Sequence, residues 1–466
     1  MNRLVISSNP FLTQAVKIDN GKITVFIIRK KNDYYIVGNV YKGVVDNISK
    51  HLGAAFIDIG IGKNAFLCID QGCSNGFFLN NCKIKVGDEI LVQVFKPIVS
   101  NKGPKVSTNI AIPGNYIVLL RDSNFIGVSK HIDDSVKINE LKNFLNQFSE
   151  NNVGFIARTA SRFATKKELE NEIKYLKSVN RKIENRFMSE KAPKLIYEEP
   201  RVPIQVIREY CDELTEEIVF DDEKMYKNTK DYFLNTSGKW QDKIRLYKEK
   251  KPMFEYYNIN SKIKELQSGT IRLKSGGYII IEKTEALFSI DVNSGSYSFD
   301  KEAEDAIFAI NKEAAYEIFN QIFLRDMGGL IVVDFIDMKY ERHKKELEEI
   351  IKKLSRKDRR KIYTSGISQF GLVEISRRKS NQDIFDIMFE KCENCLNNGL
   401  VKSTALICSE IYEKILYKYG KDKKLMLYAT PVIIEYMKKM ALDLNNVKYK
   451  ETDSCKAEDY TLEVIK

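Results

Sequence analysis

The chain has 466 residues and a mass of 53.9 kDa, which exceeds one compact core and predicts several domains. Hydrophobic residues make up 43% and charged residues 30%, and no apolar run reaches the roughly 18 residues that span a bilayer. This composition predicts a soluble globular protein without a membrane segment. Lysine and arginine number 75 and aspartate and glutamate 64, and the net charge of +11 favours a polyanionic partner without proving one.

The N-terminus and the cysteines indicate a reducing compartment. The first residues, MNRLVISSNPF, have neither an apolar signal core nor a cleavage site, so a cytoplasmic protein with free thiols is expected. Of eight cysteines, only Cys392 and Cys395 stand at a ligand-like spacing. A structural zinc ion takes four ligands, so this pair is either inert or redox-active, or two chains share one zinc ion.

Short strands with glycine turns dominate the first quarter of the chain. Residues 24–37 alternate apolar and polar side chains and turn at 30–33, which predicts a hairpin. From 38 to about 109 the strands are short and separated by glycines, which predicts a small antiparallel barrel. The elements expected next are strands at 116–120 and 153–158 and helices at 165–187, 204–215 and 222–235.

A strand–helix–strand unit comes after these elements. Strands are expected within 271–291 and an amphipathic helix at 301–324. A glycine pair ends the helix, and the apolar strand 330–335 comes next, so the two flanking strands are predicted to be parallel neighbours. The region is completed by a charged helix at 341–355 and a strand at 371–375.

Polar side chains mark the ends of these two strands. Strand alternation places Ser289, Asp291 and Asn293 on one face, and Asp334 lies within an apolar strand, where a buried carboxylate would need a partner. Adjacent parallel strands end at one sheet edge, so Asp291 and Asp334 are expected to meet there. Two carboxylates and an amide oxygen suit Mg²⁺, which can neutralise charge on a phosphodiester. The alternative is that Asp334 pairs with an arginine or caps a turn.

Aromatic and basic residues occur together on the predicted barrel. Phe56 and Phe66 fall on its strands, with Lys96 and Lys102 close in sequence. Barrels of this kind bind single-stranded nucleic acid by stacking bases on aromatic rings and by contacting phosphates with cations. The alternative, which the pattern alone favours, is that Phe56 and Phe66 belong to the barrel core.

Several long segments resemble the ribonuclease E/G family, and the resemblance runs through nearly the whole chain. The most specific are LKSGGYIIIEKTEALFSIDVNSG at 273–295 and LRDMGGLIVVDFIDM at 324–338, and ISQFGLVEISRRK at 367–379 and GNVYKGVV with GAAFIDIGIGKNAFL within 38–67 match as well. The resemblance implies an α+β multidomain chain: an RNase H-like fold with an inserted OB-type RNA-binding barrel and a 5′-sensor region, followed by a DNase I-like α/β catalytic subdomain, a zinc link and a small C-terminal domain. The implied boundaries are 1–37 and 199–265 for the RNase H-like parts, 38–111 for the barrel, 112–198 for the sensor region, 266–388 for the catalytic subdomain, 389–400 for the zinc link and 401–466 for the C-terminal domain.

The resemblance implies catalytic and RNA-binding roles for single residues. Asp291 and Asp334 match metal ligands, and Asn293 matches the residue that helps to hold the scissile phosphate. The barrel residues that match RNA contacts are Phe56, Phe66, Lys96 and Lys102.

The resemblance also implies a pocket for a 5′-monophosphate. Arg158 and Thr159 match the pair that binds this phosphate, and Gly114 and Val118 match backbone contacts of the same pocket. Lys130 stands where an arginine is common, a change that keeps the charge but loses bidentate geometry.

The implied activity is Mg²⁺-dependent hydrolysis of single-stranded RNA to 5′-phosphate and 3′-hydroxyl ends, with a preference for 5′-monophosphorylated substrates, in ribosomal RNA processing or messenger decay. Cys392 and Cys395 match zinc-link cysteines, although their loop lacks the usual proline, and a shared Zn²⁺ implies a homodimer or a dimer of dimers. No long Arg- and Pro-rich tail is present, so the short G type without a degradosome scaffold role is expected.

Two other functions compete with this one. The first is a non-catalytic RNA-binding or structural assembly protein on the same fold. A binding module has no need of a hard-metal site, so the presence of Asp291, Asn293 and Asp334 together argues against it. The second is a nuclease for DNA, which is disfavoured because no segment reads duplex grooves.

Overall fold

The structure of the protein is a computed structural model. It describes residues 1–31, 36–49, 51–68, 84–96, 103–149, 152–200, 202–236, 238–295, 303–356, 358, 360, 362–379, 383–391, 400–420, 422–452 and 459–465. The chain forms two compact units, each of which has its own sheets. Unit 1 comprises Met1–Asp33, Thr215–Glu223 and Arg245–Lys466, and unit 2 comprises Tyr34–Leu214 and Lys224–Ile244. None of the helices within the described ranges is long and apolar enough to cross a membrane.

The first sheet has five strands in the order β15-β14-β1-β2-β3. Their bounds are β1 (Arg3–Ser8), β2 (Leu12–Asp19), β3 (Lys22–Lys30), β14 (Glu217–Phe220) and β15 (Ile244–Leu246). β1, β2 and β3 pair antiparallel, and β14 runs parallel to β1. A segment from the middle of the chain therefore completes a sheet that the N-terminus begins.

The hairpin predicted for residues 24–37 falls partly outside the described residues: its first strand lies in β3, and residues 32–35 of its turn and second strand are not described. Lys22–Lys30 is one unbroken strand that pairs with β2, and Asp19 stands opposite Lys22. The turn that joins β2 to β3 lies at Asn20 and Gly21, whose φ angles are 51° and 77°. Asn-Gly is the favoured dipeptide of two-residue hairpin turns because both residues tolerate positive φ. The signal was present, just before the segment that the alternation pointed to.

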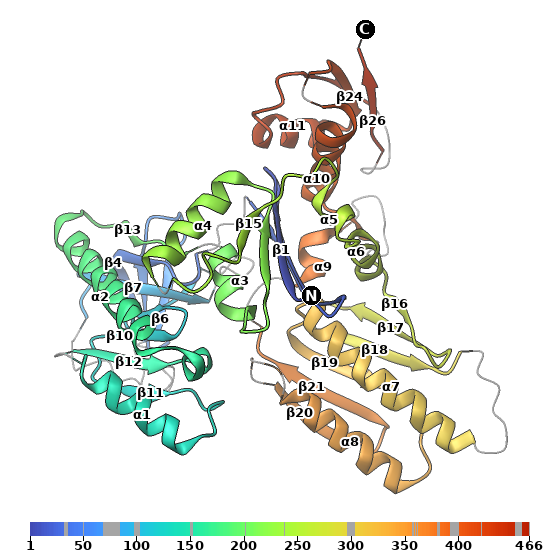
Figure 1. The fold of residues 1–466 in the computed structure, drawn as a ribbon, viewed down its shortest axis with the longest axis horizontal. Helices are drawn as coiled ribbons and strands as arrows, with labels where there is room; N and C mark the ends of the chain where they lie inside the picture. The colour runs from blue at the N-terminus through green and yellow to red at the C-terminus, as the bar shows by residue number, and fades with distance from the viewer. Residues whose placement is uncertain are drawn as a thin grey trace. The chain divides into compact units, whose positions relative to one another are not determined.

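The second sheet of unit 1 is mixed, with the order β16-β17-β18-β19-β21-β20. The strand bounds are β16 (Thr270–Arg272), β17 (Tyr278–Lys283), β18 (Leu287–Asn293), β19 (Gly329–Asp334), β20 (Ile362–Ile367) and β21 (Leu372–Arg377). β18 and β19 are parallel and are joined through α7 (Ala303–Leu324), so the predicted crossover is confirmed; the other pairs are antiparallel. α8 (Glu341–Ser355) packs beside α7 along this sheet, as Figure 1 shows.

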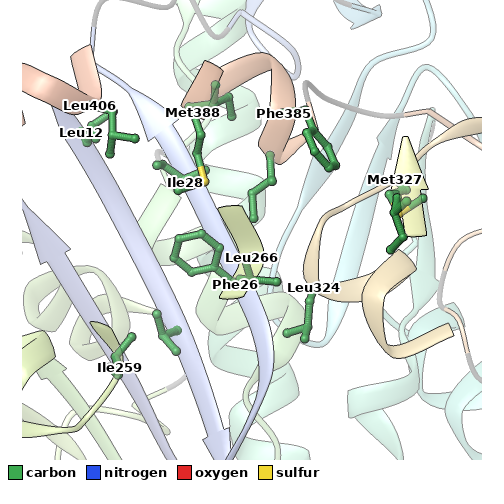
Figure 2. Close-up of a cluster of buried hydrophobic side chains, with 14 of the residues drawn as sticks. Leu12, Phe26, Ile28, Ile259, Leu266, Leu324, Met327, Phe385, Met388 and Leu406 are labelled. Atoms are coloured by element: carbon green, nitrogen blue, oxygen red, sulfur yellow. The ribbon is translucent and has the colours of Figure 1, made fainter. Parts of the chain in front are cut away.

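One core connects the two sheets of unit 1 with its C-terminal part. Figure 2 shows Leu12 and Ile28 of the first sheet close to Met388 and Leu406, with Leu266 and Leu324 in the same apolar cluster. The remaining elements of the unit are α5 (Met253–Tyr256), α6 (Asn260–Gln267), α9 (Ile384–Met388), β22 (Phe389–Lys391), β23 (Leu400–Lys402), α10 (Thr404–Lys414), η2 (Ile415–Tyr419), β24 (Leu425–Ala429), α11 (Pro431–Met440), β25 (Val447–Glu451) and β26 (Thr461–Val464).

Unit 2 contains the predicted small barrel. β4 (Val40–Ser49) pairs with both β5 and β7, so the order β4-β5-β6-β8-β7 closes on itself. The other strands are β5 (Ala54–Asp58), β6 (Ala65–Cys68), β7 (Glu89–Lys96), β8 (Lys105–Ser107) and β13 (Lys194–Tyr197), which pairs with the outside edge of β4. Closure pairs the backbone N–H and C=O groups that the edge strands of an open sheet would leave exposed.

A four-stranded sheet with helices makes up the rest of unit 2. Its order is β11-β12-β10-β9, and the elements are β9 (Ala111–Pro113), β10 (Ile117–Arg121), β11 (Ile126–Val128), α1 (Ser135–Asn146), β12 (Val153–Ala157), η1 (Thr159–Phe163), α2 (Lys166–Ser189), α3 (Val202–Tyr210) and α4 (Glu223–Asn235). α2 begins at a capping box of Thr165 and Glu168, as the predicted start at 165 requires. The predicted helix to residue 215 ends instead at Tyr210, because β14 begins at Glu217 and the chain must turn before it.

Candidate active site

The parallel pair β18 and β19 brings two carboxylates together. Asp291 and Asp334 are direct partners in the register of the two strands. Both side chains are exposed, so the premise that Asp334 is buried is wrong. The reason is that α7 and α8 cover only the face that holds Ile331 and Val333, whereas Leu330 on the opposite face is 42% exposed.

The surroundings of Asp334 disfavour its charged form. Desolvation first, and then the negative charges of Asp291 and Asp337, raise the pKa of Asp334. Among the residues that the structure describes, neither Asp291 nor Asp334 forms an ion pair with a basic side chain. An arginine partner for Asp334, the alternative considered from the sequence, is therefore not found there. A cation at this edge would relieve the repulsion.

Asn293 lies beside the pair on the same strand face. Its Nδ2 donates a hydrogen bond to Oδ2 of Asp291 over 2.8 Å, which fixes the orientation of that carboxylate. The second hydrogen of the amide remains for another acceptor. The structure thus brings Asp291, Asn293 and Asp334 together at one edge of the sheet.

Two nearby residues were not singled out from the sequence. Asp337 adds a third negative charge near Asp334. Asn311 of α7 is fully buried; its Nδ2 donates to the Ile336 carbonyl over 2.8 Å, and its Oδ1 accepts from the Ile336 N–H over 3.1 Å. This clamp holds the loop between Asp334 and Asp337. The available signal was an amide within the apolar stripe of a helix, a position that needs a polar partner.

The donor set fits a magnesium ion. Carboxylate and amide oxygens are its preferred ligands, and Mg²⁺ keeps several waters and needs only one or two carboxylates from the protein. Within the described ranges, no group of three or more His, Cys, Asp or Glu side chains is arranged as a metal cage. The open edge with Asp291 and Asp334 therefore suits a hydrated cation rather than an enclosed one.

The barrel carries aromatic rings on its outer surface. Phe56 and Phe66 are opposite each other on β5 and β6, with ring centroids 5.9 Å apart in an edge-to-face arrangement. Both are only half-buried, whereas their neighbours Ile57 and Leu67 fill the core. The interpretation of the two phenylalanines as barrel core is therefore wrong, because strand alternation points them outward.

Lysines border these rings. Lys105, which the sequence pattern did not single out, places Nζ 5.3 Å from the Phe66 ring centroid. Lys96 is exposed and stands opposite Lys105 in the register of β7 and β8. Lys102 lies outside the described residues. Rings and ammonium groups on one surface are the combination with which barrels hold single strands.

The residues predicted to bind a 5′-phosphate gather where β12 ends. Arg158 donates from its guanidinium to the Gly114 carbonyl over 2.7 Å. The Thr159 hydroxyl lies 3.0 Å from that of Ser129, which brings exposed Lys130 to the same turn. Val118 is half-buried on β10, whose neighbour is β12. The structure therefore brings Gly114, Arg158 and Thr159 together, with Lys130 on an adjoining segment.

A buried carboxylate supports this turn from behind. Glu172 is 1% exposed and accepts hydrogen bonds from the N–H groups of Asn115, Tyr116 and Ile117 over 2.6, 2.7 and 2.9 Å. Burial raises its pKa, whereas the three donors and the positive charge of Arg158 favour the ionised form. The same turn carries the Gly114 carbonyl that Arg158 contacts, so the position of that arginine depends on Glu172.

A cavity of about 310 Å³ opens next to Arg158 in unit 2. It is lined by Glu199 and Arg208, which form a buried ion pair, and by Gln93 and Gln205. Cys392 and Cys395 lie outside the described residues, so the zinc link predicted there stays a prediction.

A second cavity, in unit 1, is lined by three carboxyl groups, those of Asp221, Asp222 and Glu413. Asp221 follows β14 and accepts from the Ser7 hydroxyl over 2.5 Å and the Ser8 N–H over 2.9 Å; burial raises its pKa to about 6. Burial and then the charges of Asp221 and Glu410 raise the pKa of Glu413 on α10 to about 7. No cation faces them in the lining of this cavity as described.

These raised pKa values predict a pH-dependent stability. Between the ordinary carboxyl pKa near 4 and about 7, Asp221 and Glu413 bind more protons in the folded chain than in the unfolded chain, so their contribution to the free energy of unfolding falls as pH rises through this window. Glu413→Gln should stabilise the protein by about 1 kcal/mol at pH 8 and change little at pH 5. Urea unfolding at both pH values measures this, with exposed Glu435→Gln on α11 as the matched control. Equal effects of Glu413→Gln at the two pH values would contradict it.

Comparison with known proteins gives the family of this chain. The sequence profile of the Ribonuclease E/G family matches residues 111–380. The chain is 30% identical to Ribonuclease G of Haemophilus influenzae over 448 residues, which cover 93% of this chain and 91% of the relative. It is 30% identical to Ribonuclease G of Escherichia coli over 450 residues, with 93% and 92% covered. Ribonuclease E of Haemophilus influenzae is 34% identical over 375 residues, which are 78% of this chain and 40% of that relative.

The chain therefore belongs to the ribonuclease E/G family. It is an endoribonuclease, an α+β enzyme with a closed five-stranded barrel that acts on RNA.

Proposed function

We propose that this endoribonuclease hydrolyses single-stranded RNA with Mg²⁺ held by Asp291 and Asp334, leaving 5′-phosphate and 3′-hydroxyl ends. The observation that carries the proposal is the register of β18 and β19, which sets two exposed carboxylates side by side without a basic partner among the described residues. A bound Mg²⁺ would supply positive charge at the phosphate and lower the pKa of a water molecule.

The chain's own groups have separate tasks in this proposal. Asn293 orients Asp291 through its hydrogen bond, and its second amide hydrogen is available to a phosphate oxygen. Asn311 keeps the loop after Asp334 in place. On the barrel, Phe56 and Phe66 stack with unpaired bases while Lys96 and Lys105 contact phosphates. The last assignment extends the predicted set by Lys105.

The test of the proposal is cleavage of one short, AU-rich, single-stranded oligoribonucleotide. We expect cleavage with Mg²⁺, none with EDTA, and products that carry a 5′-phosphate and a 3′-hydroxyl. A duplex of the same sequence and the corresponding DNA strand serve as controls and should stay intact. Cleavage in EDTA, or products with a 2′,3′-cyclic phosphate, would refute the metal-dependent reaction.

The pocket at Arg158 predicts a preference for the 5′ end. A terminal monophosphate suits an arginine fork beside the Thr159 hydroxyl, so such substrates should be cut about tenfold faster than those with a 5′-hydroxyl. Arg158→Ala should remove this difference and leave the slower internal cleavage. The ratio of kcat/KM for the two substrates measures it.

Arg162→Ala is the matched control for that prediction. Arg162 lies in η1, close to Arg158 in the chain, but its guanidinium stacks on Phe163. It should keep the wild-type ratio. If wild-type protein cuts both substrates equally, the phosphate pocket has no role in this enzyme.

Three further assignments rest on the family resemblance alone. They are a Zn²⁺ ion shared through Cys392 and Cys395 of two chains, assembly as a dimer or a dimer of dimers, and work in the cytoplasm on ribosomal or messenger RNA. The shared zinc ion and the assembly also suit a chain that brings only two cysteines at ligand-like spacing.

A further inference from the structure

Phe370 presents its ring to solvent next to the carboxylate pair. It is 76% exposed, and among the described residues its ring stacks on no aromatic ring and on no cation. Exposing a phenyl ring forfeits its burial, which makes a site for an apolar or aromatic ligand a natural explanation.

The turn that carries Phe370 is held by several hydrogen bonds. The Ser368 N–H donates to the Leu372 carbonyl over 2.9 Å, and the Gly371 N–H donates to the Ser368 carbonyl over 3.0 Å. The Ser368 hydroxyl oxygen accepts from the N–H groups of Phe370 and Leu372 over 3.3 Å each. Gly371 has a φ of 80°, which closes the turn. The ring is thus displayed by a defined turn between β20 and β21.

This turn lies at the same sheet edge as the carboxylates. Leu372 is the register partner of Asp334 on β19, so Phe370 lies two residues before that position, in the turn that leads into β21. A Cβ atom built on Gly371 would stand 3.3 Å from Oδ1 of Asp337. A nucleotide next to a phosphate that faces Asp291 and Asp334 therefore lies at the sheet edge that carries Phe370.

The local charge explains why an aromatic contact is useful at this edge. Asp291, Asp334 and Asp337 place three carboxyl groups at this edge, so phosphates beyond the one at the proposed metal site meet no attraction from these side chains. A ring attracts a base through its π-face and needs no positive charge. A base within an RNA duplex is already stacked and paired, so only an unpaired base can stack on the ring, and the contact selects unpaired nucleotides.

We propose that Phe370 stacks on an unpaired base adjacent to the scissile phosphate and positions the strand at the carboxylate pair. This inference rests on the proposed function of that site and names the substrate feature that the site takes, a single-stranded nucleotide. Phe370 is a binding residue that acts before the chemical step.

The experiment compares Phe370→Ala, Phe370→Trp and Tyr316→Ala with the wild type on one single-stranded oligoribonucleotide that has a single cleavage site. Tyr316 is an exposed aromatic residue on α7, which covers the other face of the sheet. Phe370→Ala should lower kcat/KM by about 5- to 150-fold, while Phe370→Trp should stay within about threefold of the wild type. Tyr316→Ala should match the wild type.

A second arm separates stacking from a structural effect. Substrates with an abasic ribonucleotide at each position flanking the cleaved bond are tested in turn, and fluorescence anisotropy measures their Kd in the Asp334→Asn background. When Phe370 is present, an abasic nucleotide at one of these positions should raise the Kd as much as Phe370→Ala does. When Phe370 is already replaced by alanine, the same abasic nucleotide should raise the Kd less than twofold.

The inference would be overturned if Phe370→Ala had wild-type kinetics. It would also be overturned if the increases in Kd from the abasic nucleotide and from Phe370→Ala multiplied in the combination, because the two changes would then act independently. The two proposals fail separately. If the wild-type protein cuts no RNA but the binding cycle still shows the shared loss, the proposed reaction is refuted and the stacking contact is supported.

Discussion

Asp291→Asn or Asp334→Asn should lower the rate of RNA cleavage by about 10³-fold or more while leaving the Kd for RNA within a few-fold of the wild type. Each change keeps the size of the side chain but removes one of the two charges that face each other across β18 and β19. The barrel surface that carries Phe56 and Phe66 is untouched. Single-turnover cleavage and fluorescence anisotropy on the same oligoribonucleotide measure the two quantities.

Glu374→Gln provides the matched control. Glu374 is an exposed carboxylate on β21 of the same sheet, opposite Val332 rather than Asp334. Its neutralisation should change cleavage less than twofold. Retained turnover in either aspartate variant, with thermal unfolding like that of the wild type, would remove the carboxylate pair from the reaction.

Glu172→Ala should destabilise the protein by about 3–5 kcal/mol. The substitution leaves the N–H groups of Asn115, Tyr116 and Ile117 without their acceptor inside the protein, where Tyr116 is fully buried. The loosened turn also carries the Gly114 carbonyl that Arg158 contacts, so the preference for a 5′-monophosphate should fall as well. Urea unfolding followed by circular dichroism gives the free energy.

Glu184→Ala separates this effect from a loss of charge on the helix. Glu184 is exposed on the same helix, α2, and its removal should cost less than about 0.5 kcal/mol. If Glu172→Ala unfolds at the same urea concentration as the wild type, the three N–H groups do not depend on the carboxylate.

The meeting of Asp291 and Asp334 at one sheet edge was predictable because it depends on local rules. Strand alternation, a crossover helix and a glycine pair are enough to set Asp291 beside Asp334, and the register has them as direct partners. The sequence does not show that the outer face of this sheet is open, since its exposure depends on the segments that pack against it. Asp334 was therefore placed in a buried strand, although it is exposed.

Other features were missed because they depend on contacts between distant segments. The choice between core and surface for Phe56 and Phe66 required the barrel to be closed, and Lys105 reaches Phe66 only through the pairing of β6 with β8. The carboxylate of Glu172 meets N–H groups more than fifty residues away in the chain. A side chain that caps a remote turn has no sequence period by which it could be recognised.

The first hairpin shows a local signal overlooked in favour of a weaker one. Asn20 and Gly21 specify the turn through their positive φ, while the alternation that begins at residue 24 belongs to the single strand β3. The end of α3 at Tyr210 is the opposite case. The helix pattern runs on to residue 215, but the chain leaves α3 at Tyr210, before the strand Glu217–Phe220 that pairs with β1.

The central claim is that Asp291 and Asp334 hold a metal ion at the phosphate that is cut. The direct measurement is cleavage of an oligoribonucleotide with sulfur in place of a non-bridging oxygen at the scissile phosphate, because Mg²⁺ binds sulfur poorly and Mn²⁺ accepts it. The wild type should lose cleavage of the sulfur-substituted strand in Mg²⁺, and replacing Mg²⁺ by Mn²⁺ should raise the rate of that cleavage at least about tenfold. Asp334→Asn should show no such rescue by Mn²⁺. Equal cleavage of the oxygen and sulfur strands in Mg²⁺, or rescue that persists in Asp334→Asn, would contradict the claim.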